Sequence, residues 1–234
     1  MKKVKLILIM AVLLCMITNM NAQPRGMKVH YKNGNTLTTP VSEIDSITFV
    51  FLEEEEVGVV IDGIRWATRN VDMPGTFAAT PESYGMFYQW NRKTGWSSKD
   101  PMVSSDGTPW NNSNHSGDTW EKENDPCPTG WRVPTLEEQE KLVNAGSVWK
   151  SNGVTGRIFG TGNNTIFLPA PGYRTYSDGY LNWPGDYGHY WSSTYMPTSV
   201  PGNESAYYIY FSNAFAYNYA NLFGFGYSVR CVKE

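Results

Sequence analysis

Aromatic side chains are the feature that most constrains how this chain can fold. The 234 residues include 9 Trp, 15 Tyr and 10 Phe, together with 22 Gly and 14 Pro. Rings pack well on strands, whereas frequent Gly and Pro mark turns and interrupt long helices. We therefore expect short strands, turns and ordered loops, and the composition excludes a helical bundle. The hydrophobic fraction of 41% also excludes a disordered chain.

The first 22 residues have the pattern of a secretory signal peptide. Three lysines lie within the first five residues, an apolar run covers residues 6–17, and Ala22 is a small residue at the expected cleavage position. Such a run is short for a membrane-spanning helix, and no second apolar run of membrane length follows. We expect an exported protein without a transmembrane anchor, located in the periplasm, at the cell surface or outside the cell.

Loss of the signal peptide would remove Cys15 and leave two cysteines, Cys127 and Cys231. Lipid attachment at Cys15 is disfavoured because Leu14, which precedes it, is not small. In an oxidising compartment two remaining cysteines most simply form one disulfide. A metal pair lacks support, since neither cysteine has a His or a second Cys at ligand spacing.

An acidic run divides the rest of the chain. Residues 23–52 are expected to form a small β unit, with strands at 27–31 and 46–52. Residues 53–57 contain four consecutive glutamates and are expected to form a solvated linker. Residues 58–234 are expected to form one domain.

Within residues 58–234 a single segment carries clear helical signals. Thr135 followed by Glu138 is a capping box, Leu142 contributes to a narrow apolar stripe, and Gly146 is a stop signal. The strands expected elsewhere lie at residues 85–90, 165–168, 189–194, 206–211 and 227–232.

The sequence contains no recognisable catalytic constellation. The three histidines, His30, His115 and His189, are isolated from one another and from carboxylate clusters, and no G-x-S-x-G motif is present. Asp178 and Asp186 could act as paired carboxylates on a polysaccharide, which is the alternative enzymatic interpretation. The formal net charge of -3 disfavours a nucleic-acid surface.

A binding surface is better supported, because rings occur beside amide and carboxylate side chains. Sugars stack their CH faces on aromatic rings, and their hydroxyls bond to planar polar groups. The other interpretation is that the rings pack the core while the polar residues turn the chain. The candidate ligand-binding residues are Trp110, Trp120, Trp183, Asp186 and Tyr187.

Six segments resemble a known family. They are residues 62–71, 84–91, 124–135, 167–170, 188–194 and 228–232. Together they are similar to the Fibrobacter succinogenes major paralogous domain family, over about residues 58 to 233. The most specific segment reads Cys-Pro-Thr-Gly-Trp-Arg-Val-Pro-Thr, at residues 127–135. Rings inside these segments are expected to pack the core; they are Trp66, Trp90, Trp131, Tyr190 and Trp191.

This resemblance implies an α+β fold of the C-type lectin-like class, related to the formylglycine-generating sulfatase-modifying factors. It also implies secreted or surface proteins of the Bacteroidota, with residues 27–49 similar to a leader unit of such proteins. Pairing of Cys127 with Cys231 would tie the segment before the helix to the last strand. The copper-holding cysteines of the sulfatase-modifying branch and the calcium-binding tripeptides of sugar-binding lectins have no counterparts here. We therefore expect no cofactor, although loop carboxylates could bind calcium.

From these observations we expect an exported binding or adhesion module that recognises a carbohydrate or a surface protein and does not catalyse a reaction. The alternatives are the polysaccharide-acting enzyme with loop carboxylates and a structural subunit of a surface assembly.

Overall fold

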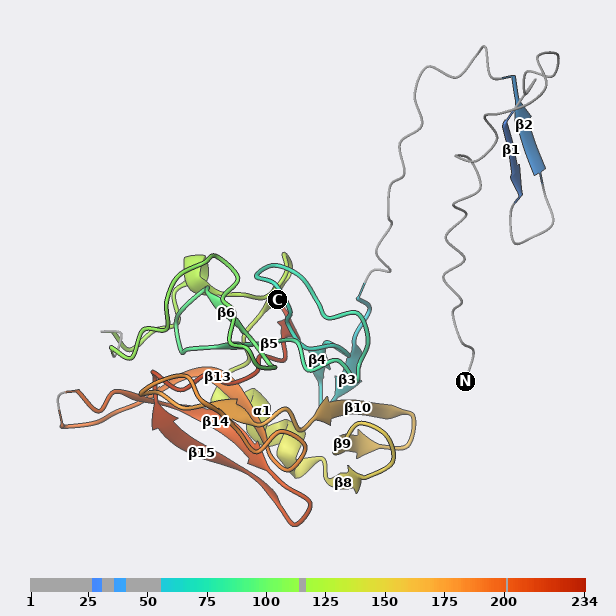
Figure 1. The fold of residues 1–234 in the computed structure, drawn as a ribbon. Coiled ribbons are helices and arrows are strands. Elements are labelled where there is room, and N and C mark those ends of the chain that lie inside the picture. Colours follow the sequence, from blue (N-terminus) through green and yellow to red (C-terminus); the bar gives the residue numbers. More distant parts are fainter. Residues whose placement is uncertain (1–26, 31–35, 41–55, 114–116, 201) are drawn as a thin grey trace. The chain divides into compact units, whose positions relative to one another are not determined.

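The structure is a computed structural model, and it forms two compact units, Met1–Glu54 and Glu55–Glu234 (Figure 1). The division falls inside the segment expected to be the linker, 53–57. The residues that the structure describes are 27–30, 36–40, 56–113, 117–200 and 202–234. The expected signal peptide and the expected strand at 46–52 lie outside them.

In the first unit two short strands pair. β1 (Met27–His30) and β2 (Thr36–Thr39) are antiparallel, with Met27 opposite Thr39 and His30 opposite Thr36. The strand expected at 27–31 is therefore confirmed from Met27 to His30.

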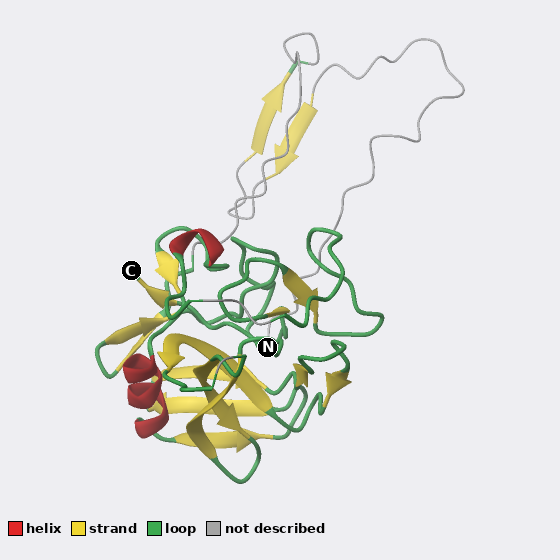
Figure 2. Cartoon of the chain, turned by 90° about the vertical axis from the view of Figure 1, so that its left-hand side faces the viewer, coloured by secondary structure: helices red, strands yellow, loops and turns green. Residues whose placement is uncertain are grey.

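Small antiparallel sheets make up most of the second unit, and loops connect them (Figure 2). The four-stranded sheet has the order β3 (Val59–Ile61), β4 (Ile64–Trp66), β16 (Val232–Lys233), β7 (Trp131–Arg132). One three-stranded sheet contains β8 (Ser147–Lys150), β9 (Gly156–Thr161) and β10 (Asn164–Pro169). The other contains β13 (Gly188–Met196), β14 (Ser205–Phe211) and β15 (Ala216–Leu222). Two pairs complete the unit: β5 (Met86–Tyr88) with β6 (Gly95–Ser97), and β11 (Tyr173–Arg174) with β12 (Leu181–Asn182).

The expected helix is confirmed as α1 (Leu136–Asn144). Thr135 is its N-cap: the Thr135 hydroxyl accepts a hydrogen bond from the Glu138 backbone N–H at 3.3 Å. The Glu138 carboxylate in turn accepts one from the Thr135 backbone N–H at 2.9 Å. Arg132 adds a bidentate ion pair to the same carboxylate, at 2.7 and 2.8 Å. Gly146, with φ at +84°, follows the end of the helix, as the sequence predicted.

The expected α+β, C-type lectin-like fold class is wrong. Among the described residues, regular helix is limited to the nine residues of α1 and a short 3-10 helix (Lys122–Asn124), whereas strands form several small, open antiparallel sheets. The physical reason is that helical start and stop signals coincide at only one place, while Gly-rich turns divide the remaining strands into short pairs and triplets. The second unit is a β-rich fold with one supporting helix.

Two clusters of buried side chains form the core of this unit, and both are rich in rings. One cluster includes Trp90, which stacks on Phe223 with ring centroids 4.1 Å apart. The other includes Phe159, which meets Phe211 edge to face at 5.7 Å. The five family-segment rings expected in the core are all buried: Trp66, Trp90, Trp131, Tyr190 and Trp191. The high aromatic content therefore serves largely as packing.

The disulfide between Cys127 and Cys231 is confirmed, with the two Cα atoms 6.1 Å apart. It joins the segment before β7 to the residue before β16, and these two strands pair directly, with Val232 opposite Arg132. The bridge therefore ties residues 104 apart in sequence at one edge of the four-stranded sheet.

The expectation of a solvated acidic run is wrong at Glu56. Its carboxylate is buried and accepts hydrogen bonds from the backbone N–H groups of Gly58 and Thr68 and from the Arg69 guanidinium, the last at 2.8 Å. Burial alone would raise the pKa of Glu56, but the bonds from Arg69 and Thr68 outweigh it and lower the pKa. Glu56 thus anchors the start of the second unit.

The sheet of β13, β14 and β15 has two different faces. Side chains alternate between faces along a strand, so Tyr190, Ile209 and Asn218, which lie opposite one another, share one face. α1 packs on this face, where the buried Gln139 side chain donates to the carbonyls of Tyr190 and Trp191 at 3.0 and 2.9 Å (Figure 1). On each strand, the residues directly before and after these three point to the opposite face of the sheet. α1 does not cover that face.

Candidate ligand-binding groove

Aromatic side chains line a groove of about 490 Å³ on the face of this sheet opposite α1. We call it the tyrosine groove. Its lining residues are Tyr173, Trp183, Tyr187, His189, Tyr208, Tyr210, Tyr217, Tyr219, Asn221, Phe225 and Tyr227. The volume lies in the range of natural small-molecule sites.

Strand register builds the centre of the groove. Tyr208 and Tyr210 alternate along β14 and lie opposite Tyr219 and Tyr217 of β15, respectively. His189 of β13 lies opposite Tyr210 on the other side. Side chains directly opposite one another on neighbouring strands have Cβ atoms about 5 Å apart, so these rings must touch. The sheet therefore presents a contiguous aromatic surface.

The exposed fraction of the rings increases from the floor of the groove to its rim. Tyr227 and His189 are 1% and 5% exposed, whereas Trp183 and Tyr219 are 55% and 59% exposed. The exposed ring of Trp183 meets Tyr187 of the groove edge to face, which ties the rim to the groove lining. The groove thus combines a rigid floor with ring faces open to solvent.

His189 lies among tyrosine rings at the floor. Its ring centroid is 4.7 Å from that of Tyr173, 4.9 Å from Tyr227 and 5.0 Å from Tyr210. Burial lowers the pKa of His189 to about 3, although a hydrogen bond with the backbone of Gly172 acts in the opposite direction. The imidazole is therefore neutral near pH 7, and its buried Nδ1 has no hydrogen-bond partner among the described residues.

Among the residues that the structure describes, no Asp, Glu, Lys or Arg side chain lines the groove. Burial raises the pKa of Tyr208, Tyr210 and Tyr227, so their hydroxyls stay protonated at physiological pH. The Asn221 amide donates to the Tyr227 hydroxyl at 2.9 Å. Ring faces and neutral hydrogen-bonding groups are therefore what the groove offers to a ligand.

Three of the five sequence-predicted ligand residues lie close together. Trp183 and Tyr187 line the tyrosine groove and meet edge to face, with ring centroids 5.9 Å apart. Asp186 lines an adjoining hollow of about 310 Å³, whose lining also includes Trp183 and Tyr187.

The other two predicted residues lie elsewhere. Trp110 lines a separate hollow of about 440 Å³, meets Trp96 edge to face at 4.9 Å and donates its indole N–H to the Tyr176 carbonyl at 2.9 Å. Trp120 is 8% exposed and packs on Trp90, with ring centroids 5.5 Å apart. The structure therefore separates Trp110 from the groove and places Trp120 in the core.

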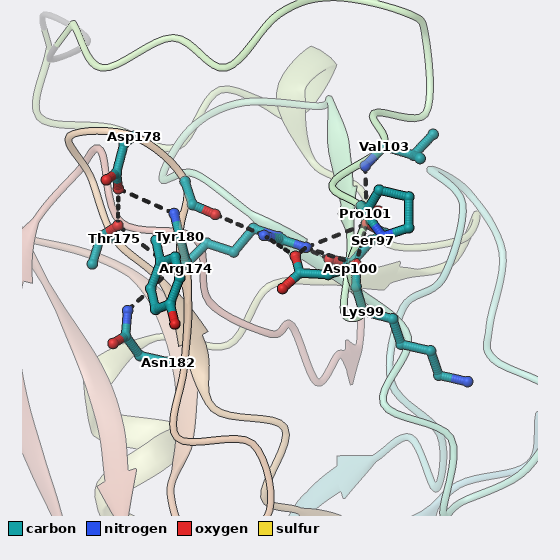
Figure 3. Close-up of polar contacts among 11 residues, drawn as sticks. Ser97, Lys99, Asp100, Pro101, Val103, Arg174, Thr175, Asp178, Tyr180 and Asn182 are labelled. Atoms are coloured by element: carbon teal, nitrogen blue, oxygen red, sulfur yellow. Dashed lines mark hydrogen bonds and ion pairs between the residues drawn. The ribbon is translucent and has the colours of Figure 1, made fainter.

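Asp178, one member of the alternative carboxylate pair, takes part in a turn (Figure 3). Its carboxylate accepts hydrogen bonds from the Thr175 hydroxyl and from the Tyr180 backbone N–H, the latter at 3.1 Å. The bond from Thr175 is the main reason that the pKa of Asp178 is lowered. The residue thus has a local structural role that accounts for its position.

The same view shows the Arg174 side chain extending from β11 toward the loop after β6 (Figure 3). Its buried guanidinium donates to the carbonyls of Ser97, Lys99 and Gly179 at 2.7–2.9 Å and pairs with Asp100 at 3.3 Å. Arg174 therefore ties β11 to the loop after β6.

Sequence reasoning missed most of the groove. The residues it did not single out are Tyr173, Tyr208, Tyr210, Tyr217, Tyr219, Asn221, Phe225 and Tyr227, and His189 was considered only as an isolated residue. A usable signal was present: tyrosines alternate at 208 and 210 and again at 217 and 219. Period-two alternation of rings predicts one aromatic face on each strand.

Over the part of the chain that the structure describes, no three His, Cys, Asp or Glu side chains are grouped so that they could hold a metal ion. Within the same residues, neither helix combines the length and apolar character that crossing a bilayer would require.

Comparison with known proteins gives one similarity. Residues 141–232 match a family model described as a domain of unknown function, DUF8237. The matched range contains every residue that lines the tyrosine groove. No curated protein and no solved structure matches the chain. The resemblance to the Fibrobacter succinogenes major paralogous domain family stays a prediction.

Proposed function

We propose that this protein is an exported binding module that holds a neutral carbohydrate in the tyrosine groove. The observation that carries the proposal is the groove lining, in which ring faces and neutral hydrogen-bonding groups occur without any charged side chain. Sugar rings expose CH groups that stack on aromatic faces, and their hydroxyls pair with tyrosine hydroxyls and amides.

The exposed rim supports the same proposal. Trp183, Tyr217 and Tyr219 leave large ring surfaces in contact with water beside the groove. Contiguous exposed apolar surface on a soluble domain generally marks an interaction site. Of the two partner classes expected from the sequence, a carbohydrate fits this rim better, because the concave, hydroxyl-rich lining matches a small polar ring.

The disulfide supports the exported location. Disulfides persist in oxidising compartments and are rare in the cytosol, and Cys127 and Cys231 are joined. Attachment at the cell surface, where many glycans are encountered, is part of the proposal.

The test is a screen of the full chain against neutral and acidic glycans, followed by calorimetric titration. In the double variant Tyr217→Ala/Tyr219→Ala we expect at least about a fivefold loss of affinity, since each ring contact is worth roughly 0.5–1.5 kcal/mol.

Tyr180→Ala is the matched control, because Tyr180 is 65% exposed and lies outside the groove lining. It should bind like the unaltered chain. A blank glycan screen contradicts the proposal, as does an equal loss of affinity in the control. Capture of a protein partner through Tyr217 and Tyr219, without glycan binding, would replace the carbohydrate by that partner.

A further inference from the structure

Two hollows meet at the exposed ring of Trp183. They are the tyrosine groove, of about 490 Å³, and the adjoining hollow, of about 310 Å³. Trp183 and Tyr187 line both. The site is therefore continuous across this ring and does not end at the rim of the groove.

The second hollow differs from the first in its chemistry. Its lining adds the ring of Trp149, the side chains of Thr155 and Ser212, and the exposed side chains of Asp186 and Asn213 to the shared rings. It therefore carries one negative charge beside its hydrogen-bonding groups, whereas the lining of the tyrosine groove is neutral. A ligand that spans both needs faces that stack on the aromatic rings and hydroxyl groups that pair with the polar side chains of each hollow.

The backbone holds Trp183 in an unusual conformation at the boundary. Its φ is +54°, in the left-handed region that bulky residues rarely adopt, and Pro184 follows it. The strand segment at Gly172 approaches so closely that a Cβ there would collide with the carbonyl oxygen of Asn182. Such a conformation persists only where the surrounding structure enforces it.

Hydrogen bonds fix the turn that carries this ring. The Gly185 N–H donates to the Ala170 carbonyl at 2.8 Å, and the Thr155 hydroxyl donates to the Gly185 carbonyl at 2.6 Å. The indole is itself held by edge contact with Tyr187, with ring centroids 5.9 Å apart. Trp183 is thus presented to solvent as a rigid platform, which lowers the entropic cost of stacking a ligand on it.

On the basis of the binding function proposed above, we propose that the ligand is a neutral oligosaccharide chain of at least two sugar units that crosses Trp183. One unit occupies the tyrosine groove, and the next occupies the hollow beside Asp186 and Asn213. A chain is needed to fill both hollows, because each hollow has the volume of a separate small-molecule site. Asp186 disfavours acidic sugars through charge repulsion.

The test measures affinity against chain length for the full protein. The probes are the monosaccharide and the tetrasaccharide of three neutral β-1,4-linked series, built from glucose, xylose and mannose, with tetragalacturonate as the acidic probe. In at least one neutral series the tetrasaccharide should bind at least tenfold more tightly than its monosaccharide. Tetragalacturonate should bind more weakly than that tetrasaccharide.

Trp183→Gly removes the ring while suiting the positive φ, and Trp183→Ala provides a second version of the same change. We expect either variant to reduce the ratio of monosaccharide to tetrasaccharide dissociation constants toward one. Tyr180→Ala should keep the ratio of the unaltered chain. Circular dichroism and thermal melting identify which variants are folded.

The outcomes distinguish this inference from the function on which it rests. Equal affinity for monosaccharide and tetrasaccharide overturns the chain-spanning site but leaves carbohydrate binding in place. Tighter binding of tetragalacturonate overturns the preference for neutral chains. An unchanged ratio in a folded Trp183 variant removes the platform role, and no binding of any probe overturns both proposals.

Discussion

The imidazole of His189 lies beneath tyrosine rings. It stays neutral at a pH at which an exposed histidine would begin to take up a proton. Its neighbours on the strands around it are Tyr173, Tyr208, Tyr210 and Tyr227, none of which carries a charge at or below neutral pH. No neighbouring carboxylate compensates a positive charge there, so burial dominates its pKa. The stability of the fold around the groove floor should therefore depend on pH through the protonation of His189.

This linkage gives a prediction about stability. Below pH 6.5 the unfolded chain binds a proton at His189, whereas the folded chain does not until about pH 3. The free energy of unfolding should therefore decrease as the pH falls through this window, with a slope from this group of about 1.4 kcal/mol per pH unit. Urea unfolding at pH 7, 6 and 5 measures it.

His189→Gln is the comparison for this experiment, because it keeps a polar side chain and removes the titration. Its unfolding free energy should fall less steeply between pH 6 and 5. Glu56 also has a lowered pKa, but its contribution is lost only as the pH falls below about 4.5. An identical slope in the variant and the unaltered chain would contradict the role assigned to His189.

At the scale of elements, α1 supports the sheet that carries the groove through a polar contact. The Gln139 amide donates to two β13 carbonyls, next to the register shift between Trp191 and Tyr195. Its oxygen accepts a hydrogen bond from Asn218 of β15 at 3.2 Å. One helical side chain therefore bonds to both outer strands of the sheet.

Gln139→Leu should lower the free energy of unfolding by at least about 2 kcal/mol, since it leaves two buried carbonyls without their donor. Glu140→Leu places the same new side chain on the exposed face of the helix and should change stability much less. Denaturant midpoints measure both. Equal effects of the two substitutions would show that the hydrogen bonds of Gln139 contribute little.

Elements with strong local signals could be predicted from the sequence. The capping box at Thr135 and Glu138 predicted α1, and the strand expected at 206–211 is confirmed as β14. β15 was not predicted, because Asn218 and Asn221 are unfavourable in strands, and the pairing with β14 and the contact with α1 that stabilise it are not visible in the local sequence. The inward position of Gln139 was missed for a similar reason: its partners come from a sheet more than 50 residues away in sequence.

At the scale of the whole molecule, the disulfide closes the second unit near its C-terminal strand. Cys231 is fully buried in the same core cluster as Cys127, Trp131 and Tyr227, so the bridge lies within the packing that supports the groove floor. The pairing could be predicted because, with Cys15 assigned to the expected signal peptide, the two remaining cysteines allow one bridge. The arrangement of small sheets could not, since it depends on contacts between distant strands, and the lectin-like fold class inferred from resemblance was wrong.

Loss of this bridge should be costly. In the chain-entropy account, a loop of 104 residues stabilises the folded state by about 4–5 kcal/mol. The double variant Cys127→Ala/Cys231→Ala should therefore unfold at a clearly lower denaturant concentration than the oxidised chain. Reductant should shift the midpoint of the unaltered chain toward that of the variant and leave the variant unchanged. A shift equivalent to less than about 1 kcal/mol would contradict the structural role of the bridge.

The proposal that the tyrosine groove binds neutral carbohydrate is tested most directly by a crystal structure of the full chain with the neutral tetrasaccharide that binds most tightly. We expect one sugar ring against the tyrosine rings of β14 and β15, and the next unit on the far side of Trp183. A tetrasaccharide bound elsewhere, such as in the hollow beside Trp110, with the tyrosine groove empty, would contradict the account.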